Sequence, residues 1–71
     1  MKFPIGSLVQ VVDDPDVFYC GARGKVASFN PILDEYLVHF IAIDVDDGEE
    51  FVYEECFYHE DELILVKEGL K

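Results

Sequence analysis

The sequence predicts an all-β domain in which five short strands close into a small barrel. The chain has 71 residues, 51% of them hydrophobic and 14% aromatic, which is enough for one small core. Five short apolar runs, rich in β-branched and aromatic residues, alternate with segments of turn chemistry. Almost no segment favours a helix, and closing the sheet would remove its exposed edges. We therefore expect a single domain over residues 1–71.

The first three strands are predicted from apolar runs bounded by turn residues. Leu8–Val12 comes first, and Gly24–Phe29 follows and stops at an Asn-Pro dipeptide. The irregular stretch between them is closed by Gly21 and Gly24, a residue type that tolerates positive φ. Tyr36–Ile43 is the longest run and alternates in a way that suits a central strand with one deeply buried face.

The second half of the chain predicts a hairpin and a last short strand. Asp44–Gly48 ends in Asp-Gly, the strongest short-range hairpin signal, and Glu50–Glu54 returns as the fourth strand. His59–Glu62 is too short for an α-helix, so we expect a single 3-10 turn there. Leu63–Val66 forms the fifth strand, and the charged tail after it is expected to fray.

Two further expectations concern residues 54–62 and the composition of the core. Residues 54–62 have an alternative as one short helix, because glutamate favours helices. The period-two pattern within the strands assigns eight residues to the core: Val9, Val11, Val26, Tyr36, Val38, Phe40, Leu63 and Leu65.

Charge and cysteine content exclude several classes of protein. Sixteen acidic residues against five basic ones give a net charge of −11, so direct binding to nucleic-acid phosphates is not expected. There is no apolar run of membrane-spanning length and no signal-peptide core near the start, which favours a cytoplasmic protein without membrane contact. Two cysteines are too few for a disulfide scaffold. A domain this small has little room for a deep active site, so we expect neither an enzyme nor a cofactor.

Two groups of residues partly match the sequence patterns of metal-binding sites. Cys20, His39, Cys56 and His59 include the ligand types of a zinc site, but only Cys56 and His59 have local chelate spacing. Unpaired, partly buried thiols are the favoured interpretation, with a metal-handling or redox role as the alternative. Asp44, Asp46 and Glu55 match positions 1, 3 and 12 of a calcium loop, but the glycine of the loop is one position early and its flanks are strands.

The order of elements resembles a group of small SH3-like barrel accessory proteins. Gly6–Val11 is similar to their G-x-x-V-x-V strand, and Gly24–Ser28 is similar to the G-x-V-A-x strand of photosystem I PsaE subunits. Tyr36–Phe40 resembles the Y-x-V-x-F strand that follows, and Tyr58–Leu63 resembles the F-x-E-D-E-L turn. The same pattern occurs in NdhS-type subunits, NifZ proteins and the variable chain of ferredoxin–thioredoxin reductase. The resemblance implies an SH3-like barrel and an accessory role.

The resemblance does not extend to charge. PsaE-like and NdhS-like barrels bind acidic ferredoxin through basic residues, and only Arg23 and Lys25 are placed to carry over such a contact. At a net charge of −11, this chain repels ferredoxin at long range. We therefore expect a different partner, one with a basic surface.

Acidic clusters and loop aromatics are the candidate binding residues. The acidic surface has a plain interpretation as a solubilising device, but its charge exceeds the ~2–8 that suffices for a small domain. The aromatic residues in the two irregular stretches either pack over the barrel ends or anchor a protein contact. The candidates are Phe18, Tyr19, Asp46, Asp47, Glu54, Glu55, Phe57 and Tyr58.

These observations favour a non-catalytic adaptor that binds a larger protein through loop aromatics and one acidic face. The alternative is an acidic inhibitor, for example one encoded by a phage, that mimics nucleic-acid phosphates and blocks a nucleic-acid-binding protein. Dispersed phosphate-like contacts weaken steeply with salt, whereas aromatic anchors do not, so ionic strength separates the two hypotheses.

Overall fold

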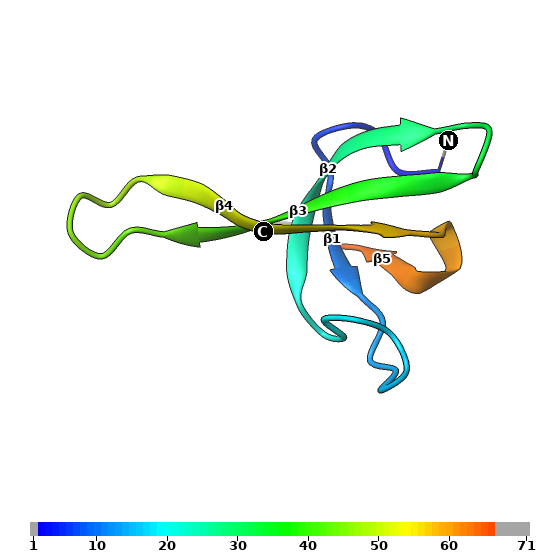
Figure 1. Cartoon of the computed structure of the whole chain (residues 1–71), viewed down its shortest axis with the longest axis horizontal. Helices are drawn as coiled ribbons and strands as arrows, with labels where there is room; N and C mark the ends of the chain where they lie inside the picture. Colours follow the sequence, from blue (N-terminus) through cyan, green and yellow to red (C-terminus); the bar gives the residue numbers. More distant parts are fainter. Residues whose placement is uncertain (1, 67–71) are drawn as a thin grey trace.

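The computed structural model describes residues 2–66 and consists of five antiparallel strands and one 3-10 turn (Figure 1). The all-β class, the number of strands and the short turn before the last strand are therefore confirmed. The expected frayed tail after Val66 lies outside the described residues. The elements are β1 (Leu8–Val11), β2 (Arg23–Asn30), β3 (Glu35–Ile43), β4 (Glu50–Tyr58), η1 (Glu60–Glu62) and β5 (Leu63–Leu65).

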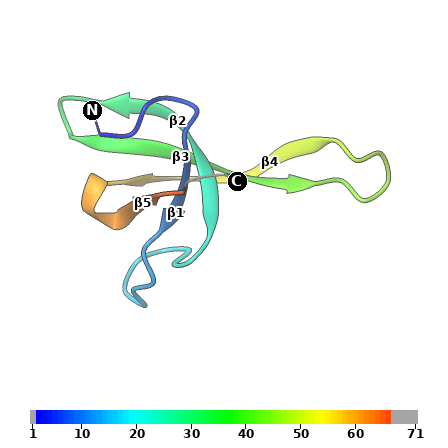
Figure 2. The same ribbon diagram turned by 180° about the vertical axis from the view of Figure 1, so that it is seen from behind.

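The strands form one sheet in the order β4-β3-β2-β1-β5. A register shift between Val26 and Ser28 interrupts the pairing of β2 with β3, and β2 curves strongly from the β1 side to the β3 side (Figure 2). Bulges bend a strand and increase its twist, which lets β2 belong to both halves of the sheet. Within residues 2–66 the edge strands β4 and β5 do not pair with each other, so closure into a barrel stays a prediction.

The core lies on one face of the curved sheet and follows the predicted alternation. Seven of the eight predicted core residues are buried, among them Val9 and Val11 of β1 and Tyr36, Val38 and Phe40 of β3. The prediction for Leu65 is wrong. Its side chain is 44% exposed, because β5 is an edge strand.

The core also contains two aromatic residues that the sequence pattern did not assign to it, Phe3 and Tyr58. Phe3 lies outside any strand, yet it is buried and packs edge-to-face on Tyr36 with ring centroids 5.2 Å apart. The Tyr36 hydroxyl accepts hydrogen bonds from the backbone N–H groups of Lys2 and Phe3. These two bonds hold the N-terminal segment across one end of the core.

The fourth strand is longer than predicted and excludes the helical alternative. β4 runs to Tyr58 and pairs with β3 along its length except at Tyr53, with Tyr36 opposite Tyr58 and Val38 opposite Cys56. The segment from residue 54 therefore continues as a strand, because pairing with β3 places Tyr58 in the core, where it is 2% exposed. Helix propensity is a weak preference that tertiary packing overrides.

The hairpin formed by β3 and β4 extends well beyond the rest of the sheet (Figure 1). Pairing of β3 with β2 ends at His39, whereas pairing with β4 continues to Ile43 opposite Glu50. We call residues 41–53 the arm. The molecule measures 39 × 29 × 24 Å, and its radius of gyration of 12.5 Å exceeds the value of about 11 Å for a compact domain of this length.

The 3-10 turn is the only helical element in residues 2–66, and it is far too short to cross a membrane.

Candidate protein-binding surface

Asp46 and Asp47 lie in the tip loop of the arm, where local hydrogen bonds shape the turn. The backbone N–H of Asp46 donates to the Asp44 carboxylate at 2.7 Å, and that of Glu49 donates to the Asp47 carboxylate at 2.9 Å. Gly48 adopts a φ of 74°, a conformation that glycine tolerates without strain. The loop holds several carboxylates at the end of the molecule farthest from the core.

The partial calcium-loop match does not assemble into a site. Asp44 and Asp46 lie in the tip loop, whereas Glu55 pairs with His39 in the body of the sheet. Ile43 at the base of the loop is four residues further along the strand than His39, a distance of about 13 Å at 3.3 Å per residue. Within residues 2–66 there is no group of three or more metal-ligating side chains that could hold an ion.

Tyr58, one of the predicted binding residues, is buried in the core and does not lie on the exposed surface of β4. Its side chain is buried against Phe40, with the rings perpendicular at 6.3 Å, and its hydroxyl donates to the carbonyl of Phe18 at 2.6 Å. Burial raises the pKa of the Tyr58 hydroxyl strongly, with a smaller effect from Cys56. Tyr58 therefore positions the Phe18 loop and leaves partner contact to other residues.

Phe18 and Tyr19 are exposed on the loop between β1 and β2. The Phe18 ring is 75% exposed, and Tyr19 adopts a positive φ of 57° and packs on Phe40 with ring centroids 5.2 Å apart. Desolvation, followed by the charge of nearby Glu54, raises the pKa of Tyr19. Phe40 is also the strand partner of Glu54, so Phe18, Tyr19 and Glu54 lie near one another on the core-facing side of the sheet.

Glu55 and Phe57 lie on the opposite face of β4, because successive strand residues alternate in direction. Phe57 is 57% exposed and pairs with Leu37, and the Glu55 carboxylate is 3.1 Å from Nε2 of His39. The predicted binding residues are thus divided between two faces of β4 and the arm tip. They do not form one continuous patch.

Sequence analysis missed the apolar surface of the arm. The run Tyr36–Ile43 was interpreted as a central strand with one deeply buried face, but within residues 2–66 β3 pairs with β4 alone past His39. The arm therefore exposes several large apolar side chains, and Val45 in the tip loop is 95% exposed. They are Ile43, Val45, Phe51, Val52 and Tyr53.

The structure shows two free cysteines and no enclosed pocket in residues 2–66. Cys20 is exposed and Cys56 is half-buried against the core, and both are free thiols. In the described part of the chain there is no pocket that would enclose a small ligand.

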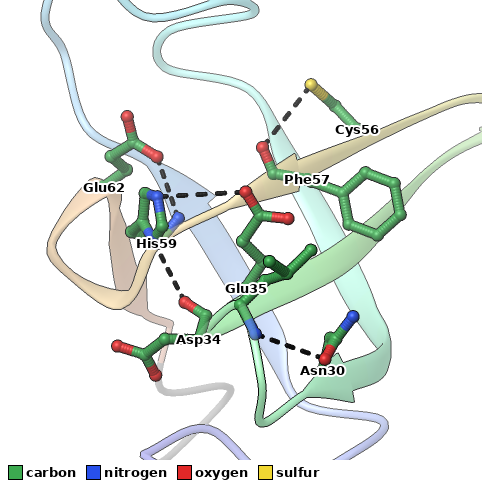
Figure 3. A network of polar contacts seen from close by, with 8 residues as sticks. Asn30, Asp34, Glu35, Cys56, Phe57, His59 and Glu62 are labelled. Atoms are coloured by element: carbon green, nitrogen blue, oxygen red, sulfur yellow. Dashed lines mark hydrogen bonds and ion pairs between the residues drawn. The ribbon is translucent and has the colours of Figure 1, made fainter.

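His59 joins the turn between β2 and β3 to the 3-10 turn η1, and Figure 3 shows its contacts with Asp34, Glu35 and Glu62. Its Nδ1 is 3.0 Å from the carbonyl of Asp34 in the β2–β3 turn, and its Nε2 is 3.9 Å from Glu35. Its backbone N–H donates to the Glu62 carboxylate at 2.9 Å. The hydrogen bond to Asp34 and the neighbouring carboxylates raise the pKa of His59. This cluster fastens the two turns together, and we assign it to stability.

Comparison of the chain with known proteins found no matching family model, no matching curated protein and no matching solved structure.

Proposed function

We propose that this chain is a non-catalytic acidic adaptor with an SH3-like fold, and that it binds a larger protein with a basic surface. The observation that carries the proposal is the arm, which extends from the body and combines exposed apolar side chains with carboxylates. A two-stranded ribbon is only marginally stable by itself in water. Apolar side chains concentrated on such a ribbon are typical of a protein contact.

The order of the strands supports the SH3-like part of the proposal. β1 pairs with both β2 and β5, the strongly bent β2 continues into the β2–β3–β4 sheet, and a 3-10 turn precedes β5. This arrangement agrees with the accessory barrels that the sequence resembles. The two halves share one core that includes Val9, Val38 and Phe40, and this shared core supports the proposed closure.

The distribution of charge supports a basic partner. Seven of the twelve residues from 44 to 55 are acidic, and no Lys or Arg occurs between Lys25 and Lys67. β3, β4 and the arm therefore carry uncompensated negative charge, which speeds the encounter with a positive surface and opposes a negative one.

Paired neutral substitutions test this proposal. Asp46→Asn with Asp47→Asn removes two charges from the tip, and Glu54→Gln with Glu55→Gln removes two from β4. Asp13→Asn with Asp16→Asn is the matched control, since it removes the same charge from the exposed β1–β2 loop. Each protein is used for affinity capture from the source lysate at two salt concentrations, with quantification by mass spectrometry.

We expect the tip pair or the β4 pair to reduce capture of a basic protein, and the control pair to leave it unchanged. Surface substitutions of this kind usually change the stability of a fold very little. Equal losses in all three variants, with a steep decline in salt, would refute the adaptor. That result is typical of dispersed phosphate-like contacts and supports nucleic-acid mimicry. Identical capture by all variants would reduce the acidic surface to a solubilising device.

A further inference from the structure

β4 has an unpaired edge that the proposed function does not yet use. Within residues 2–66, β4 is the terminal strand of the sheet and pairs with β3 alone. An edge strand presents a row of backbone N–H and C=O groups on its free side, and another chain can pair with them. At nine residues, β4 is also one of the two longest strands in the described sheet.

The segment of β4 from Glu54 to Tyr58 is the part of this edge that packs against the core. The register shifts between Phe40 and Ile41 of β3, where Tyr53 has no partner, so a bulge separates the arm from this segment. Beyond the bulge the pairing is regular, and Cys56 and Tyr58 rest against the core. A strand held in place by its buried face requires little further ordering when another strand joins it.

The side chains beside this edge define what occupies it. Glu54 lies on the core-facing side near Tyr19, and Glu55 and the exposed Phe57 lie on the outer side. Neighbouring side chains of paired strands contact each other directly, so opposite charges across the pair are favourable and like charges are unfavourable. A complementary strand therefore carries two successive cations opposite Glu54 and Glu55 and an apolar residue opposite Phe57.

The same charges oppose a second copy of this chain as the occupant. Two molecules that meet along β4 bring together two acidic arms and two net charges of −11. Acidic residues on an edge strand are a known device against such self-association. The acidic residues of β4 therefore disfavour pairing with β4 of a second copy and favour pairing with a basic strand.

We infer that the outer edge of β4, from Glu54 to Tyr58, accepts one additional β-strand from a protein partner in which one residue separates two consecutive Lys or Arg residues from an apolar residue. This inference rests on the proposed function, because it states how the basic partner binds. Backbone hydrogen bonds to β4 supply affinity, and the alternate side chains supply specificity.

A synthetic peptide tests strand addition directly. The palindromic sequence Val-Lys-Lys-Ala-Val-Ala-Lys-Lys-Val, acetylated and amidated, presents the required pattern in both strand directions. The control peptide has the same side chains, but the backbone nitrogens of its central residues are methylated, so neither edge donates hydrogen bonds. Each peptide is titrated into the ¹⁵N-labelled full chain, and amide shifts and amide hydrogen exchange are measured at low and moderate salt.

We expect the unmodified peptide to slow hydrogen exchange at alternate amides of Glu54–Tyr58 and to bind about tenfold more tightly than the methylated control. Glu54→Gln with Glu55→Gln should weaken binding several-fold, and the matched control Asp13→Asn with Asp16→Asn should not. Tight binding by both peptides, without new protection in β4, would overturn strand addition but leave a basic partner for the acidic surface. Absence of binding by either peptide, together with normal capture of a basic protein, would also overturn it. Concentration-dependent dimerisation along β4 in the free protein would assign the edge to a second copy instead.

Discussion

Replacing Tyr36 with phenylalanine removes one oxygen atom that secures the N-terminal segment to the core. The Tyr36 hydroxyl accepts hydrogen bonds from Lys2 and Phe3, the latter at 3.2 Å between atoms in a buried environment. Each bond contributes about 1 kcal/mol net, and a buried N–H left without a partner costs about 1–3 kcal/mol. We therefore expect Tyr36→Phe to lower the free energy of unfolding by about 2 kcal/mol, although it removes no apolar surface.

Thermal and urea unfolding measure this loss. A change of about 2 kcal/mol lowers the Tm of a domain of this size by roughly 8–16 °C. The matched control is Tyr53→Phe, which deletes the same atom from an exposed side chain in the arm and should change stability by less than about 0.5 kcal/mol. Hydrogen exchange at the Phe3 amide should accelerate in Tyr36→Phe alone. Equal stability of the two variants, with the Phe3 amide still protected, would refute the proposed role of the hydroxyl.

Three further predictions concern a close approach, a titration and the net charge. Gly24→Ala places a Cβ 2.7 Å from the carbonyl oxygen of His39, and overpacking against backbone should cost about 1–3 kcal/mol in urea unfolding; unchanged stability would show that β2 shifts freely. The folded-state pKa of His59 is raised by the Asp34 carbonyl and nearby carboxylates, so its stabilising effect is complete below the unfolded pKa of about 6.5 and is lost as pH rises through the folded value. His59→Gln should therefore destabilise the protein more at about pH 5.5 than at about pH 8.5, and an equal loss at both would contradict the assignment. Because the net charge is −11 and screening acts over ~8–10 Å, the Tm should rise with sodium chloride, and a flat Tm would indicate that the charges are already balanced locally.

Much of the fold was predictable because local sequence and burial agree. The Asp-Gly turn and the Asn-Pro turn lie at hairpin ends, and the alternation of Tyr36, Val38 and Phe40 matches the buried face of β3. Phe3 was not predicted to enter the core, because nothing in its local pattern indicates a contact with a side chain 33 residues away. The prediction that Leu65 is buried failed for a related reason, since an alternating pattern does not distinguish an edge strand from a central one.

The candidate site was less predictable because it depends on which strand ends lack a neighbour. The acidic and aromatic residues were identified from composition, but their division between two faces of β4 follows from the register, which places Tyr58 inside and Phe57 outside. Most exposed apolar side chains of the arm were assigned to strands correctly, with Val45 in the predicted turn, yet their exposure depends on where the pairing of β3 with β2 stops.

The sequence by itself determined the strands, the turns and the concentration of negative charge, because these depend on residues close together along the chain. Tertiary structure decided three other features: the burial of Phe3 and Tyr58, the projection of the arm beyond β2, and the free edge of β4. Each depends on contacts between residues distant in sequence, or on the absence of a neighbouring strand within the described residues. Strand periodicity is a local property, whereas the number of partners that a strand finds is set by the packing of the whole chain.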